Sequence, residues 1–217
     1  YLMKKLFPWV IAICLLNSCV SIHIENLLND IETYISERPD SALAVLDSID
    51  RDMLTTRQVR SHHALLHAMA LDKNFIDVSE DSLAQTALNY YNHHGYKKYK
   101  ARSLYYLGLS YYYNKEYDKA ILEFTKAEEV AKKCDSLYWG MIKVAQADTY
   151  IKTFNEVEEY RCLNKAYDIY KSIGSEHYLS IAKLRLARSL SNQKQFFQSD
   201  SLLNEIIYTD SVDHSVL

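Results

Sequence analysis

Histidines in the first half of the chain are the residues best suited to bind a metal ion. His62, His63 and His67 lie close together, and His63 and His67 would share one face of a helix, one turn apart. No glutamate follows in the HExxH pattern, and the sequence places no third ligand beside them. We therefore expect hydrogen-bonded or solvated histidines, and neither a metal nor another cofactor.

The cysteines divide into an N-terminal pair and a pair in the body of the chain. Cys14 and Cys19 lie within the first twenty residues, whereas Cys134 and Cys162 lie far apart without the CxxC spacing. An exported protein could oxidise the second pair to a disulfide. We expect two unpaired thiols instead, since the helices that carry them would place the sulfurs at different heights.

Composition and motifs argue against catalysis and against nucleic acid as a partner. The 217 residues are 48% hydrophobic and 24% charged, with a formal net charge of −3. A mildly acidic surface does not attract nucleic acid. No segment has the pattern of a nucleophile elbow, a phosphate-binding glycine loop or a pair of catalytic carboxylates, so we do not expect an enzyme.

The N-terminal segment resembles the leader of a bacterial lipoprotein. Lys4 and Lys5 precede an apolar run over residues 6–16, which is too short to span a bilayer comfortably. The run ends Leu-Asn-Ser-Cys at residues 16–19, which is similar to a lipobox. The resemblance implies cleavage of residues 1–18, diacylation of Cys19 and a lipid anchor facing the periplasm. An ordinary leader and an uncleaved anchor helix are the alternatives.

A pair of helices is predicted between Ala101 and Cys134. Apolar and small residues recur at helical spacing on either side of a polar break at residues 114–116; they are Leu104, Leu107, Gly108, Tyr111, Ala120, Phe124 and Ala127. Small residues on both helices would let the two backbones approach closely. The pattern predicts an antiparallel helical hairpin.

The same residues and offsets resemble the tetratricopeptide repeat (TPR), except that Leu104 replaces the usual Trp and Lys132 the usual Pro. The small residue of the first helix recurs as Ala68, Gly108, Ala147 and Ala187, at intervals of 40, 39 and 40 residues. An unrelated helical bundle is the alternative. We expect an all-α superhelix over residues 22–208, with hairpins at 22–50, 56–94, 97–133, 136–173 and 175–208 and a tail from 209 to 217.

In the TPR family the first helix of each hairpin lines a concave groove that binds a peptide. Transfer of the groove positions to this chain implies a candidate binding surface. Its residues are Arg102, Tyr105, Leu109, Tyr112, Tyr113, Asp148, Ile151, Lys152, Arg188 and Asn192, with Met69, Asp72 and Lys73 from the preceding hairpin. Tyr105 and Tyr112 could equally pack between hairpins.

These patterns together predict a membrane-anchored, non-catalytic scaffold in the bacterial envelope that binds an unidentified protein or peptide. The alternative is the N-terminal sensor half of a signalling protein or transcriptional regulator, since bacterial TPR segments often precede a transmembrane helix and an output domain. In that case an apolar run of about 20 residues would follow residue 217.

Overall fold

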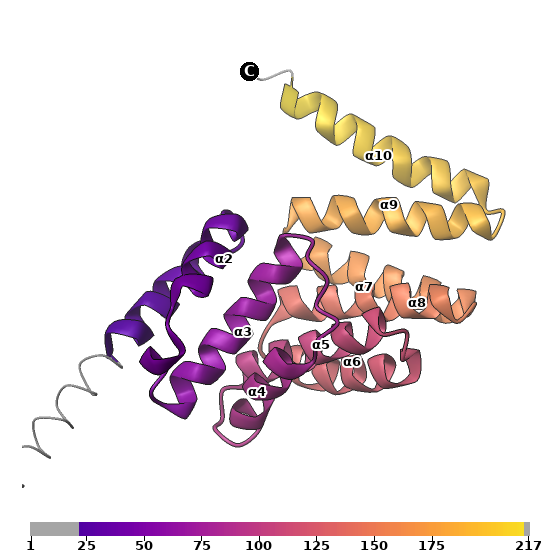
Figure 1. Ribbon diagram of the computed structural model, residues 1–217. Helices are drawn as coiled ribbons and strands as arrows, with labels where there is room; N and C mark the ends of the chain where they lie inside the picture. The colour runs from indigo at the N-terminus through magenta and orange to yellow at the C-terminus, as the bar shows by residue number, and fades with distance from the viewer. Residues whose placement is uncertain (1–21, 215–217) are drawn as a thin grey trace, which may run out of the picture. The chain divides into compact units, whose positions relative to one another are not determined.

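The computed structural model describes the backbone of residues 22–214 and the side chains of residues 22–207. The predicted leader at 1–18 and the predicted lipid site Cys19 lie outside these described residues. A helix over residues 22–34 is followed by α2 (Pro39–Ser48), a short 3-10 helix η1 (Arg51–Met53), α3 (Arg57–Lys73), α4 (Ser82–Tyr91), α5 (Lys97–Tyr113), α6 (Tyr117–Ala131), α7 (Ser136–Lys152), α8 (Glu156–Ser172), α9 (Glu176–Asn192) and α10 (Phe196–His214). The described residues contain no strand, and the predicted all-α class is confirmed (Figure 1).

The chain divides into two compact units, one up to Tyr106 and one from Leu107 onward, so that the division falls within α5. In the first unit α3 packs against both α2 and α4. In the second unit each helix from α6 to α10 packs against the next along the chain. Short turns join the partners, so that consecutive helices run antiparallel, as helical repeats require.

Capping residues begin several of these helices where the sequence supplies them. Thr56 Oγ1 accepts a hydrogen bond from the backbone N–H of Val59 (3.1 Å), and Asn155 Oδ1 accepts one from Glu158 (3.2 Å). Pro39 occupies the first turn of α2, where its missing N–H costs nothing. Gly174, at φ 66°, follows α8 in the left-handed conformation that ends many helices.

Close contact between α5 and α6 depends on Gly108. A Cβ atom at Gly108 would lie 2.5 Å from Cε1 of Phe124, which no real packing allows. Ala120 and Ala127 on the facing helix are fully buried. The predicted close approach of the two backbones is therefore confirmed in the second unit, which contains all four of these residues.

Four turns between paired helices share one backbone conformation. Phe75, Lys115, Phe154 and Lys194 have φ of 59°, 63°, 58° and 61°, and they recur at the same 40-, 39- and 40-residue intervals as the small residues. In each turn the next N–H donates to a carbonyl five residues back, as from Glu116 to Tyr111 (2.8 Å). These are the bonds of a Schellman-type helix end. The repeat is thus a property of the backbone as well as of the sequence.

The predicted tail from residue 209 is wrong at its start, because α10 continues to His214. Neither glycine nor proline occurs between Phe196 and His214, so nothing local ends the helix earlier. None of the helices among the described residues combines the length and the hydropathy that a membrane-spanning segment needs. Cys134 is exposed and Cys162 is buried, and they form no disulfide with each other.

Candidate peptide-binding site

A pocket of about 230 Å³ lies in the second unit and draws its lining from successive hairpins. Its residues are Tyr112 from α5, Asp148, Ile151 and Lys152 from α7, Glu159 from α8, and Arg188 and Asn192 from α9. Spacings of three and four residues along α7, and of four along α9, place these side chains on one face of each helix. The first helices of successive hairpins therefore provide most of the surface.

The pocket brings together six residues of the predicted groove: Tyr112, Asp148, Ile151, Lys152, Arg188 and Asn192. Other members of the predicted set do not line it. Leu109 is 7% exposed and belongs to the packed interior, whereas Tyr113 is 41% exposed outside the pocket.

Two cations of this pocket have no carboxylate partner among the described residues. Neither Lys152 nor Arg188 forms an ion pair there, whereas Asp148 is bound by Arg185, which comes from α9. The positive charges of Lys152 and Arg188 are thus free to meet an anionic group of a ligand. Charge-assisted hydrogen bonds of this kind are among the strongest that proteins form.

Glu159 lies at the buried side of the pocket. Its burial raises the pKa of the carboxyl group, and the negative charge of Glu156 adds to this. A hydrogen bond with Ser189 and the charge of Arg188 act in the opposite direction. Ser189 and Arg188 both belong to α9, so Glu159 ties α8 to the helix that carries the cation.

Tyr112 presents a protonated hydroxyl group at the rim. Partial burial, together with the charge of Asp148, raises the pKa of this phenol. Its ring meets those of Tyr113 and Tyr117, with centroids 5.6 Å and 6.0 Å away, which restricts its orientation. A tyrosine held in this way offers an apolar ring and a hydrogen-bond donor at low entropic cost.

Arg102 and Tyr105 belong to the first unit. Arg102 is 8% exposed, and its guanidinium donates to Glu32 Oε1 at 3.0 Å. Glu32 also accepts a hydrogen bond from Tyr99 (2.7 Å). Tyr105 is 6% exposed, with its ring edge-on to that of Tyr106. Arg102 therefore links the helix over residues 22–34 to α5, rather than presenting a cation to solvent.

His63 and His67 are engaged with ordinary partners. His67 Nε2 lies 2.9 Å from Asp47 Oδ1, and His63 Nε2 lies 3.0 Å from the carbonyl oxygen of Leu46. His62 Nε2 lies 3.4 Å from Glu32 Oε2. Within residues 22–207 no group of three or more side chains is placed to bind a metal ion.

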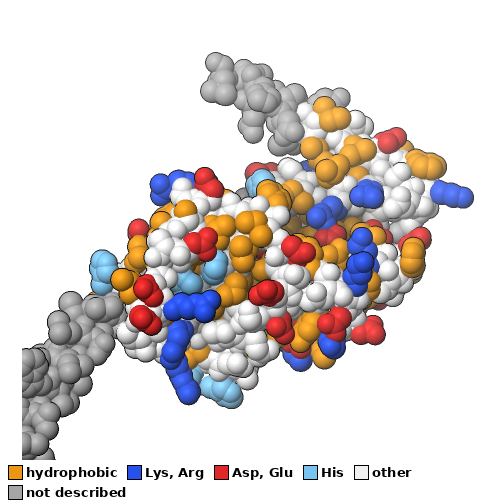
Figure 2. Space-filling model, viewed as in Figure 1, with side chains coloured by type: hydrophobic (Ala, Val, Ile, Leu, Met, Phe, Trp, Pro, Cys, Tyr) orange, Lys and Arg blue, Asp and Glu red, His pale blue; other side chains and the backbone are white. Residues whose placement is uncertain are grey.

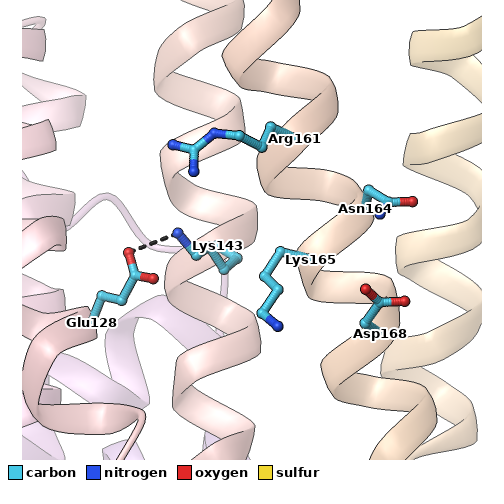
Figure 3. A pocket seen from close by; sticks show the side chains of 6 residues that line it. All are labelled: Glu128, Lys143, Arg161, Asn164, Lys165 and Asp168. Atoms are coloured by element: carbon cyan, nitrogen blue, oxygen red, sulfur yellow. Dashed lines mark hydrogen bonds and ion pairs between the residues drawn. The ribbon is translucent and has the colours of Figure 1, made fainter.

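A second pocket of about 280 Å³ in the same unit already holds its own ion pair. Its lining is polar and comes from α6, α7 and α8: Glu128, Lys143, Arg161, Asn164, Lys165 and Asp168 (Figure 3). The nearly buried Lys143 donates to Glu128 Oε2 (2.7 Å) and to Gln146 Oε1 (2.9 Å). Because Glu128 neutralises the most buried cation, this pocket is a weaker candidate for binding a charged ligand.

Sequence reasoning missed Glu159 and Arg185 as parts of the binding pocket and its surroundings. Glu159 stands 39 residues after Ala120, where the neighbouring hairpin has a small buried residue. A carboxylate at a position that packing reserves for a small side chain was the available signal. No signal in the sequence pointed to Arg185, because its partner Asp148 lies 37 residues away in sequence.

Comparisons with known proteins show the architecture without naming a family. No family model matches the chain, and no curated protein matches it. The crystal structure of BtubC (BKLC) from P. vanneervenii is similar over 98% of this chain and 86% of its own, with a TM-score of 0.60 at 14% identity. The apo form of RapI matches 82% of this chain, which corresponds to 61% of RapI, with a TM-score of 0.50 at 12% identity. The chain is thus an all-α helical-repeat protein.

Proposed function

We propose that this chain is a TPR-like, non-catalytic scaffold that binds an extended protein or peptide segment in the pocket lined by Tyr112, Lys152 and Arg188. The observation that carries the proposal is the convergence, from α5, α7 and α9, of one aromatic side chain and two cations without ion-pair partners. Aromatic and arginine side chains in a concave site are the usual anchors of protein recognition.

The chemistry of the pocket favours a ligand with a carboxylate next to an apolar group. Lys152 and Arg188 would bind the carboxylate, while Tyr112 and Ile151 would contact the apolar part. Asn192 offers both a donor and an acceptor to a peptide backbone. An extended segment would cross the first helices in turn, since each contributes one part of the lining.

Selection of peptides from a random library on the purified chain, followed by calorimetry, tests the proposal. The selected peptides should carry an acidic residue, and Tyr112→Ala with Arg188→Ala should weaken binding at least roughly thirtyfold. Tyr160→Ala with Lys171→Ala, two exposed side chains of α8 outside the pocket, is the matched control. Equal affinity of the pocket variant and the wild type, with unchanged melting, would show that peptides bind elsewhere.

We also propose that the scaffold is a lipoprotein of the bacterial cell envelope, anchored through Cys19 and facing the periplasm. The support is the leader-like sequence of residues 1–19. Each CH₂ group of an acyl chain adds about 0.8 kcal/mol to membrane binding, so several chains would hold the protein firmly.

Metabolic labelling tests the anchor. The wild type should incorporate palmitate and partition into detergent, whereas Cys19→Ser should lose the label. Cys134→Ser, which changes an exposed cysteine far from the leader, is the control and should keep it. A mature N-terminus at any other residue would contradict the lipoprotein proposal.

A further inference from the structure

Two turns of the second unit lie at the same edge of the molecule. The helices α7, α8, α9 and α10 run antiparallel, each packed on the next, so the α7–α8 and α9–α10 turns lie at the same end of the helices (Figure 1). The α6–α7 turn, which contains Cys134, lies at the opposite end of α7. The two ends can therefore be compared within one folded unit.

The end of the second unit that carries the α7–α8 and α9–α10 turns exposes three large apolar side chains. Phe154 is 92% exposed, Val157 is 76% exposed and Phe197 is 87% exposed. Val157 and Phe197 occupy the same repeat position, 40 residues apart. The next hairpin, α9 and α10, packs after Val157 and does not cover it. This position of the repeat therefore faces solvent even where another hairpin follows. We refer to Phe154, Val157 and Phe197 as the apolar edge; hydrophobic side chains do reach the rim of the second unit (Figure 2).

Phe154 is unfavourable in the isolated fold for two reasons. Its φ of 58° is in the left-handed region, which costs a residue with a Cβ atom energy that glycine or asparagine avoids. Its ring also remains in water, although burial of a ring is strongly favourable. The equivalent turn of the first unit repeats the combination at Phe75, with φ 59° and 98% exposure. The recurrence indicates a role outside the packing of the fold.

We propose that the apolar edge inserts into the headgroup region of a lipid bilayer. Phe154 and Phe197 would enter the interface, where aromatic rings are favoured, while the exposed Lys194 beside them would keep its amine at the phosphate level. Glu156 and Asp200 are exposed near the starts of α8 and α10, so that, with Lys152 and Lys194, the charges of these two segments sum to zero. Because the local charges cancel, insertion depends on the apolar side chains, suits zwitterionic lipid and is insensitive to salt.

A lipid surface fits this edge better than a protein partner does. Three side chains of this size expose roughly 500 Å². A partner in a standard protein complex buries roughly 800 Å² on each side. The residues also stand on two separate turns with polar residues between them, which a protein would have to desolvate. A bilayer, in contrast, can take up each protruding ring separately, without a continuous apolar surface. The proposal rests neither on peptide binding nor on acylation of Cys19.

Local probes in the full chain test the proposal, because residues 6–16 could hold the whole chain on vesicles. The test variant carries a single exposed thiol, which lies in the first turn of α10 next to Phe197. It combines Gln198→Cys with Cys14→Ser, Cys19→Ser and Cys134→Ser, and its remaining cysteine, Cys162, is buried. The control keeps Cys134 as its exposed thiol at the opposite edge. Both thiols are labelled with an environment-sensitive dye, and phosphatidylcholine vesicles with brominated acyl chains quench a dye that enters the bilayer.

Vesicles should quench the dye at residue 198 and leave the dye at residue 134 unaffected, at low and high salt alike. Phe154→Asn with Phe197→Gln should lower the partitioning of the edge at least roughly tenfold. Asparagine tolerates positive φ and both sites are exposed, so the double variant should melt no lower than the wild type. Equal quenching at the two sites, or unchanged quenching in the double variant, would overturn the proposal. So would a lipid-free spectral shift at residue 198 on concentrating the protein, which would indicate a second copy on this edge.

Discussion

At the scale of single residues, the two helices of a hairpin pack through a pair of one small and one large side chain. Gly108 receives the ring of Phe124 in one hairpin, and Gly140 receives the ring of Tyr170 in the next. Gly140 lies 39 residues after Ala101, not after Gly108, so the close contact has moved along the helix. Both contacts pair a glycine with an aromatic ring, although neither partner keeps its repeat position.

Gly108→Leu should lower the free energy of unfolding by about 1–3 kcal/mol, because the larger side chain would overlap the ring of Phe124. Urea denaturation followed by circular dichroism measures the change. Gly108→Ala combined with Phe124→Leu, which opens space for the added methyl group, should cost less than the sum of the two single changes. Unchanged stability of Gly108→Leu would mean that α5 and α6 do not meet at this residue.

The carboxyl group of Asp72 should make the stability of the protein depend on pH. Burial raises its pKa to about 6, and the charge of the adjacent Lys73 only partly opposes this. The pKa of an unfolded aspartate is about 3.9, so the folded state binds more protons between pH 4 and 6 and loses stability as the pH rises through this range.

Asp72→Asn should therefore raise stability at pH 7 by roughly 1–3 kcal/mol and change it little at pH 3.5. Thermal melts at the two pH values measure the difference. Asp77→Asn, an exposed aspartate just after α3, is the matched control and should have little effect at either pH. Equal effects of Asp72→Asn at both pH values would show that its carboxyl group titrates normally.

At the scale of elements, the four turns that contain Phe75, Lys115, Phe154 and Lys194 are strained in the same way. Each has a residue other than glycine at positive φ, as at Lys115 and Lys194. Glycine adopts this conformation without a steric penalty, but it also has more freedom to lose on folding. The balance favours glycine where the native φ is positive and the side chain is exposed.

Lys115→Gly should accordingly raise the free energy of unfolding by up to about 1 kcal/mol. Leu122→Gly, at an exposed site inside α6, should instead lower it by about 1 kcal/mol, because glycine is a poor helix former. Denaturant melts of both variants distinguish the two effects. Destabilisation by both changes would contradict the left-handed conformation of Lys115.

At the scale of the whole molecule, stability is expected to vary from helix to helix, since repeat proteins are stabilised by contacts between neighbours. In the second unit α8 packs against both α7 and α9, whereas α10 packs chiefly against α9. A helix with one packed neighbour opens at lower cost than a helix with two.

Hydrogen exchange followed by mass spectrometry should show this difference in the 217-residue chain. Amides of α10 should exchange at least roughly tenfold faster than those of α8, which corresponds to a difference of about 1.4 kcal/mol in opening free energy. Peptides from α7, which also has two packed neighbours, are the internal reference. Equal protection of α8 and α10 would mean that the second unit opens as a single cooperative body.

The helices and their pairing follow from patterns that are readable in the sequence. Capping residues such as Thr56, the 3.6-residue period and small residues such as Gly108 act through neighbours along the chain or in the next helix, so their effects can be inferred locally. The resemblance to the tetratricopeptide repeat implied that Tyr112 and Arg188 share one surface.

Which charges remain available on that surface depends instead on contacts between residues far apart in the sequence. Arg102 is bound to Glu32, 70 residues away in sequence, and Asp148 is bound to Arg185, 37 residues away. Nothing in the local pattern distinguishes these residues from Lys152 or Arg188, which have no such partner. The pairing of charges depends on which side chains face one another after the helices have packed, and periodicity along a single chain does not contain that information.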